Sequence, residues 1–241
     1  MSVNEIVRII PTVKVNNRKL NEKFYIETLG MKPLLEESAF LSLGDQSGVE
    51  KLILEEAPSM RTRRVEGFKK LARLLVKVKN PSEIEDLLSQ MESIPRLFKG
   101  SRGYAFEIVS PEQDVILVHA ENHIKDLVPL ETVPEFSSNK SIKYLSQFEV
   151  SMELRLPEGT ESLLDPEGVA PVITFTKGQG PDLAVENNVT WDLTMLKFLV
   201  KNFDLTSLRQ KFEKTGYFVP KSEKFFLGKD TNNIELWFEE A

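Results

Sequence analysis

A run of cationic side chains between residues 61 and 79 is the part of this 241-residue sequence best suited to binding chemistry. Eight lysines and arginines lie there, and Glu66 is the one acid among them. In a chain with a net charge of −6, such a run can attract an anionic ligand or an acidic protein surface. The alternative is a solvated face that binds nothing. The candidate ligand-binding residues of the run are Arg61, Arg63, Arg64 and Arg73.

Residue types that catalyse hydrolysis or bind transition metals are sparse. The chain has no cysteine, which excludes disulfides, thiolate metal sites and a cysteine nucleophile. His119 and His123 have the spacing of helical metal ligands, but the HExxH motif is absent and a zinc site needs three or four protein ligands. Structural or surface roles are the alternative for both. No GxSxG or other hydrolase motif is present, so the sequence identifies no catalytic residue.

Charge and hydropathy argue against two broad classes of protein. Residues 1–120 contain 18 Lys+Arg and 17 Asp+Glu, whereas residues 121–241 contain 13 and 20. A nucleic-acid-binding protein usually shows the opposite overall sign, so we expect no nucleic-acid partner. No apolar run approaches the roughly 20 residues of a membrane helix, and residues 1–15 lack the apolar core of a secretory signal. We therefore expect a cytoplasmic protein with no membrane partner, which would reach the cell surface only by a non-classical route.

Residues 16–31 are predicted to form the helix around which the first half of the chain is organised. Apolar-rich extended segments precede and follow it. Asn16 or Asn17 can cap its start, and Gly30 can end it because glycine enters the left-handed conformation without a steric penalty. Several side chains fall on one side of a 3.6-residue helix, which predicts a buried stripe. These residues are Leu20, Phe24 and Met31, with Thr28 between them.

The order of predicted elements divides the chain into two similar halves. Residues 1–120 show a strand, a helix and three strands, twice in succession. Residues 121–140 contain two prolines and no periodicity, which is typical of a linker. In residues 141–241 the first helix is missing, but the strand, polar cap and amphipathic helix of residues 197–212 repeat the pattern of residues 74–88. The sequence therefore predicts an α+β protein with an N-terminal and a C-terminal domain.

The pattern Phe24-Tyr25, four residues, Leu-Gly after a strand resembles the first module of the vicinal-oxygen-chelate (glyoxalase-like) superfamily. The resemblance implies tandem glyoxalase-like domains built from βαβββ modules, with the third module degenerate. In that superfamily a divalent metal usually lies between paired modules. Its ligand positions in the first half fall at Ile10, near Arg73 and at Leu117, none of which can hold the metal as required. We expect no cofactor.

The second half offers an alternative metal site through the same resemblance. Asn232-Asn233-Ile234-Glu235-Leu236 resembles the closing Asn-x-x-Glu-Leu pattern of the superfamily. Carboxylate oxygens suit magnesium, calcium or manganese. The candidate ligands are Glu235, Asp192, Glu149 and Glu153. Otherwise, these acids only line solvated strand faces.

Arg73 is a candidate binding residue because of the strand face on which it is predicted to lie. Leu74, Val76 and Val78 share one face of this strand, which leaves Arg73 on the other face. In a glyoxalase-like module, that face would line the cleft. A partly desolvated arginine needs an anionic partner, either a ligand or an internal carboxylate such as Glu107.

Over nearly its whole length the sequence resembles the CppA family of Gram-positive cocci. The resemblance rests on the FYIETLGM opening, the acidic second half and the segment VTWDLTMLKFLVKNFDLTSL. Members of this family are described as proteinases that degrade the third complement component, which implies a host complement protein as substrate and partner. The alternative function is a metal-free, non-catalytic protein that binds a small anionic ligand or a protein partner. A scaffold role is a third hypothesis, and a homodimer is compatible with each.

Overall fold

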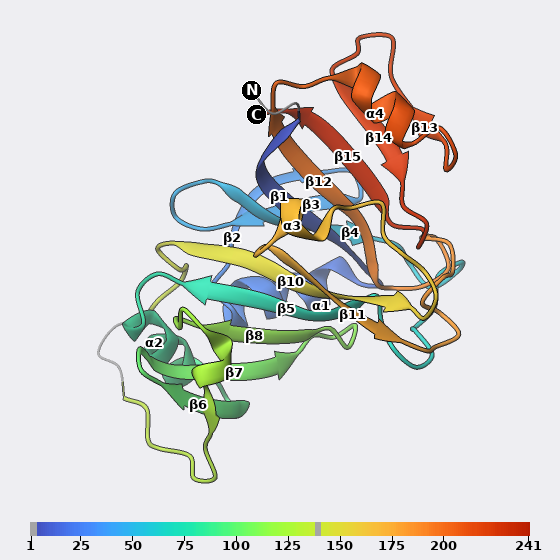
Figure 1. Cartoon of the computed structure of the whole chain (residues 1–241). Helices are drawn as coiled ribbons and strands as arrows, with labels where there is room; N and C mark the ends of the chain where they lie inside the picture. The colour runs from blue at the N-terminus through green and yellow to red at the C-terminus, as the bar shows by residue number, and fades with distance from the viewer. Residues whose placement is uncertain (1–3, 138–140) are drawn as a thin grey trace. The chain divides into compact units, whose positions relative to one another are not determined.

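The computed structural model in Figure 1 describes residues 4–137 and 141–241. It confirms an α+β protein in which strands dominate and helices are few. The chain forms two compact units. Unit 1 comprises Met1–Asn16, Ala57–Ala72 and Glu153–Ala241, and unit 2 comprises Asn17–Glu56 and Arg73–Met152. No helix in the described part of the chain is both long and apolar enough to cross a membrane.

Unit 2 contains two groups of strands with short helices between them. The strands β2 (Lys32–Glu37), β3 (Phe40–Gly44) and β4 (Glu50–Glu56) form an antiparallel meander. The second group has the order β5 (Leu71–Val78), β8 (Val115–His119), β7 (Gly103–Val109), β6 (Arg96–Gly100) and β9 (Val128–Pro129). The helical elements are α1 (Arg18–Glu22), the π-helix η1 (Lys23–Thr28), α2 (Ser82–Gln90) and the 3₁₀ turn η2 (Ile124–Asp126).

The span that we predicted to be a linker contains η2 and β9, and β9 pairs with β6 through Phe98 and Pro129. Residues 138–140 of that span lie outside the described residues. The domain boundaries at residues 120 and 141 stay a prediction.

Unit 1 is built on one sheet with the strand order β13, β14, β15, β12 and β1. Strand β1 (Glu5–Val15) runs antiparallel to β12 (Leu193–Lys201), and β12 runs parallel to β15 (Glu235–Glu240). The remaining elements are β13 (Tyr217–Phe218), β14 (Phe225–Lys229), β11 (Ile173–Gly178), α3 (Pro166–Val169) and α4 (Leu205–Lys211). Strand β10 (Phe148–Pro157) begins in unit 2 and ends in unit 1.

Helix α4 covers one face of this sheet. Asp204 caps its start by accepting a hydrogen bond from the Thr206 N–H at 3.0 Å, as the sequence predicts for a helix that begins there. Phe212, just past the helix, packs its ring against Phe226 and Phe238. Gly228 permits this approach, because a Cβ there would lie 2.5 Å from the Phe212 ring.

The segment between residues 16 and 31 is helical, with the predicted ends but a different buried side. Asn17 caps the start by accepting from the Leu20 N–H at 3.0 Å, and Gly30 ends the helix with φ +67°. The predicted stripe is wrong at Leu20, which is 54% exposed, and Phe24 is only half-buried. Within the helical turns the buried side chains are Asn21, Tyr25 and Leu29, and Met31 of the predicted stripe is fully buried just beyond Gly30.

The predicted and observed sides have the same four-residue spacing and differ by one residue in phase. Helical periodicity gives that spacing, but the choice between Leu20 and Asn21 rests on polarity. Asn21 is buried although it is polar, because its Nδ2 atom donates to the Asn17 carbonyl at 2.9 Å and to Oε1 of Glu112 at 3.1 Å. The second half of the segment is a π-helix, in which the Leu29 N–H donates to the Phe24 carbonyl, five residues back, at 3.1 Å.

We predict that Tyr25→Ala lowers the free energy of unfolding by about 3–5 kcal/mol, because it empties a fully buried aromatic site. The neighbouring half-buried ring offers a matched control, and Phe24→Ala should cost clearly less. Urea denaturation of both variants beside the parent measures the two losses. An equal loss in the two variants would contradict the packing described here.

Candidate ligand-binding site

The face of the unit 2 sheet that carries Arg73 is the candidate ligand-binding site. On β5, Leu74, Val76 and Val78 are fully buried on one face, as predicted from their alternation. Arg73, Leu75 and Lys77 therefore occupy the other face.

Strand pairing brings further polar side chains to the same face. Leu75 pairs with Leu117 and Lys77 with His119 on the parallel strand β8, and Glu107 of β7 lies opposite Leu117. Residues directly opposite one another on neighbouring strands share a face. Leu75 and Leu117 are 8% and 2% exposed, so the charged groups flank an apolar floor.

Arg73 has the internal partner that we considered as one of its two options. Its Nη1 atom lies 3.8 Å from Oε2 of Glu107, which is an ion pair too long for a direct hydrogen bond. Arg96 approaches the other carboxylate oxygen, Oε1, at 3.3 Å. The Arg73 side chain keeps 28% of its surface exposed. Two arginines thus share one carboxylate, and solvent still reaches Arg73.

His119 lies at the end of this face and is 4% exposed. Burial lowers its pKa from 6.5 to about 4, and the positive charges of Lys77 and Arg73 act in the same direction, against a smaller opposing effect of Glu121. The imidazole is therefore uncharged at neutral pH. Its buried Nδ1 atom has no hydrogen-bond partner among the described residues.

The other arginines of the cationic run belong to unit 1. Arg63 donates two hydrogen bonds to the buried carboxylate of Asp182, each 2.7 Å long. These hydrogen bonds lower the pKa of Asp182. Arg61 and Arg64 are exposed. The four predicted arginines are thus divided, with Arg73 in unit 2 and the rest in unit 1.

The predicted metal ligands are also divided between the units, with Asp192, Glu153 and Glu235 in unit 1 and Glu149 in unit 2. Asp192 is buried, and its carboxylate accepts from the backbone N–H groups of Lys70, Leu71 and Leu193 at 2.6, 3.1 and 2.8 Å. Burial raises its pKa. Over residues 4–137 and 141–241, no three acidic or histidine side chains come together as a metal site would require. The metal assignment stays a prediction.

Sequence reasoning missed the environment of His119 and the Arg63–Asp182 pair. Asp182 lies 119 residues from Arg63, and no local motif connects the two. The pairing of His119 with Lys77 depends on the parallel register of β5 and β8. The alternation of apolar residues along both strands predicts the face on which each side chain lies, but it does not predict which residue of the next strand lies opposite.

We predict that His119 makes the chain less stable in mild acid. Its folded-state pKa, about 4, lies below the ordinary value of 6.5, so the unfolded chain takes up this proton first as the pH falls. The stabilisation that comes from keeping His119 neutral is present above pH ~6.5 and is lost as the pH falls towards ~4. His119→Gln removes this titration, so the free energy of unfolding should depend less on pH between those values.

Denaturant titrations at several pH values test this, with His123→Gln as the matched control because His123 is exposed. The control should follow the parent. A His119→Gln profile parallel to that of the parent would show that His119 is not held neutral by the fold.

The whole chain is similar to known proteins. The CppA N-terminal family description matches residues 8–130, and the CppA C-terminal description matches residues 145–238. The crystal structure of the cppA protein from Streptococcus pneumoniae TIGR4 is 68% identical, covers 100% of both chains and superposes with a TM-score of 0.96. No curated protein sequence matches the chain.

A more distant likeness concerns the fold alone. A point mutant of glyoxalase I from Zea mays is 11% identical, with a TM-score of 0.55 over 96% of this chain and 92% of that one. The βαβββ modules predicted from the sequence thus have their counterpart in a glyoxalase structure. By its two family matches and its full-length identity to the pneumococcal protein, the chain belongs to the CppA family.

Proposed function

We propose that the chain is a non-catalytic binding protein whose unit 2 sheet face takes a small anionic ligand through Arg73. The observation that carries the proposal is the place of Arg73, whose side chain is 28% exposed beside the apolar residues Leu75 and Leu117. A guanidinium at such a place can bind a carboxylate or phosphate through two parallel hydrogen bonds.

The charges around Arg73 favour an anion. Lys77 on β5 and Arg96 on β6 add positive charge to the same sheet, and uncharged His119 adds none at neutral pH. Glu107 opposes them, and Glu149 lies on β10, the strand next to β5. The apolar floor of Leu75 and Leu117 lowers the local polarity, which strengthens each electrostatic interaction at the face.

By the sequence resemblance, Arg73 also falls near a position where glyoxalase-like proteins commonly hold a metal ligand. A guanidinium is always charged and has no lone pair for a metal, so it repels a divalent cation. It supplies instead a fixed positive charge on this face of the sheet. The anionic group that a metal would hold in a relative would here be held by Arg73 itself.

We predict that Arg73→Met abolishes stabilisation by anions while leaving the ligand-free stability nearly unchanged or higher. The mutation removes both the anion partner and the desolvation penalty of the charge. Melting temperatures with and without phosphate or citrate measure both effects, since a ligand of the folded state raises the melting temperature. Arg96→Met is the matched control, because Arg96 is the other partner of Glu107 and its side chain is 63% exposed. This variant should keep most of the stabilisation by anions.

Two results would contradict the proposal. Equal anion stabilisation of Arg73→Met and the parent would remove Arg73 from the site. A large loss of stability in Arg73→Met without anions would favour a purely structural pair with Glu107.

Proteolysis of complement is the second candidate, and membership of the CppA family is the observation that favours it. Such an enzyme needs an activated nucleophile or water. His119 is a candidate base, since its low pKa keeps it unprotonated, but no serine or threonine hydroxyl within the described residues is hydrogen-bonded to its Nδ1 atom.

Incubation of the purified chain with the third complement component distinguishes the two functions. The binding proposal predicts no cleavage above that seen without the chain. Parallel samples contain a chelator, a serine-hydrolase inhibitor, or the His119→Gln variant. Cleavage that is lost in one of these samples would replace the binding proposal with an enzymatic one and would indicate the class of catalyst.

A further inference from the structure

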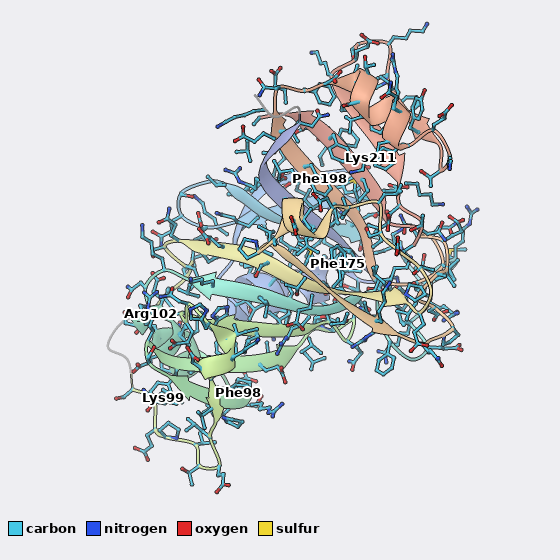
Figure 2. The ribbon with its side chains drawn as sticks, in the orientation of Figure 1. Phe98, Lys99, Arg102, Phe175, Phe198 and Lys211 are labelled. Carbon is cyan, nitrogen blue, oxygen red and sulfur yellow. The ribbon has the colours of Figure 1, made fainter. Side chains whose placement is uncertain are left out.

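A cavity of about 290 Å³ lies in unit 1 between α3, α4 and the sheet. Its apolar walls are Ile6, Leu164, Val169, Phe198, Leu208 and Phe238. Its polar groups are Asp165, Ser207, Lys211 and Asn4. Figure 2 labels Phe198, on β12, and Lys211, at the end of α4, in the same part of unit 1. The volume is at the lower end of ligand pockets, which start at about 300 Å³, so a small molecule fits best.

The floor of the cavity is rigid. The register of β12 and β15 places Phe198 opposite Phe238, and their rings stack with centroids 4.7 Å apart and planes 14° apart. Phe212 meets the Phe238 ring edge-on at 6.0 Å. Such contacts hold both rings in place, with Phe238 at the cavity wall and fully buried Phe198 behind it, so this wall is formed before any ligand arrives.

The polar side of the cavity carries one charge of each sign. Lys211 has no hydrogen bond or salt bridge to any residue that the structure describes, and much of its side chain is exposed. Partial burial lowers the pKa of Lys211, and the negative charges of Asp165 and Asp230 act in the opposite direction. Asp165 uses Oδ1 to accept from the Glu167 N–H at 3.2 Å. Its Oδ2 atom lies beside Gly168, where a Cβ would come within 3.2 Å. The Asn4 side chain is already hydrogen-bonded to the backbone of Asp204, so Asn4 only lines the cavity.

We propose that this cavity binds a free α-amino acid with an apolar side chain. The ligand carboxylate pairs with the Lys211 ammonium, the ligand ammonium pairs with the Asp165 carboxylate, and the side chain packs against the apolar wall at Phe238. An apolar carboxylate without an ammonium would leave Asp165 facing a like charge. An apolar amine without a carboxylate would do the same to Lys211. The arrangement therefore selects a zwitterion with an apolar substituent.

Calorimetric titration of the full chain with three matched ligands tests this selection. The ligands are L-leucine, 4-methylpentanoate, which lacks the ammonium, and isoamylamine, which lacks the carboxylate. We expect L-leucine to bind about tenfold more tightly than either analogue, because each loses one charge-assisted contact. Absence of L-leucine binding, or equal affinity for an analogue, would overturn the proposal.

Charge-removing variants then assign each contact. Lys211→Met should weaken the binding of L-leucine by about tenfold or more. Asp165→Asn keeps the Oδ1 atom that accepts from the Glu167 N–H. It should weaken the binding of L-leucine and strengthen the binding of 4-methylpentanoate. A merely structural role of Asp165 would not produce this reversal. Lys214→Met, an exposed lysine three residues beyond Lys211 that does not line the cavity, is the matched control and should bind like the parent.

Loss of L-leucine binding in the Lys214→Met control as great as in Lys211→Met would overturn the assignment. If a variant does not fold, the ranking of the three ligands on the parent chain decides the proposal. The cavity lies in unit 1 and Arg73 in unit 2, so either result is independent of the anion site.

Discussion

The burial of one face of β5 is the constraint on which the candidate site depends. Leu74, Val76 and Val78 are fully buried, and each contributes roughly 1.5–3 kcal/mol by leaving water. Because side chains alternate along a strand, this burial forces Arg73 and Lys77 to the opposite face. A shift of one residue would bury two charges and expose three apolar side chains. The register of β5 therefore places the cationic groups firmly.

The same constraint explains the electrostatics of the site. Charges held at the edge of an apolar floor are less well solvated than charges in free water, so each affects its neighbours more. Lys77 and Arg73 both disfavour a proton on His119, which burial already disfavours. Glu107 relieves part of this positive field by lying between Arg73 and Arg96. An incoming anion would relieve more of it, and this is the physical basis of the proposed binding.

The fold class, the helix caps and the two faces of β5 could be predicted from the sequence because each depends on local pattern. Asn17, Gly30 and Asp204 act within a few residues of their own position. The buried side of the helical segment was predicted one residue out of phase, because polarity favoured Leu20 over Asn21 and the partner that allows Asn21 to be buried, Glu112, lies 91 residues away.

The site could be predicted only in part. Alternation along the strand assigned Arg73 to its face and offered Glu107 as a partner, but the second arginine on that carboxylate comes from the pairing of β6 with β7, through Arg96 and Glu107. The cavity beside Lys211 combines residues of both ends of the chain, from Asn4 to Phe238, so no window of the sequence contains it. Such sites follow from tertiary register and not from motif.

The pKa of His119 in the presence of an anion tests the account most directly. The imidazole signals can be followed by NMR as the pH is lowered, with exposed His123 as a reference in the same sample. The account predicts that saturating phosphate or citrate raises the pKa of His119 above its ligand-free value of about 4, because the bound anion offsets the charges of Arg73 and Lys77. An unchanged pKa of His119 with the anion present would contradict binding at this face.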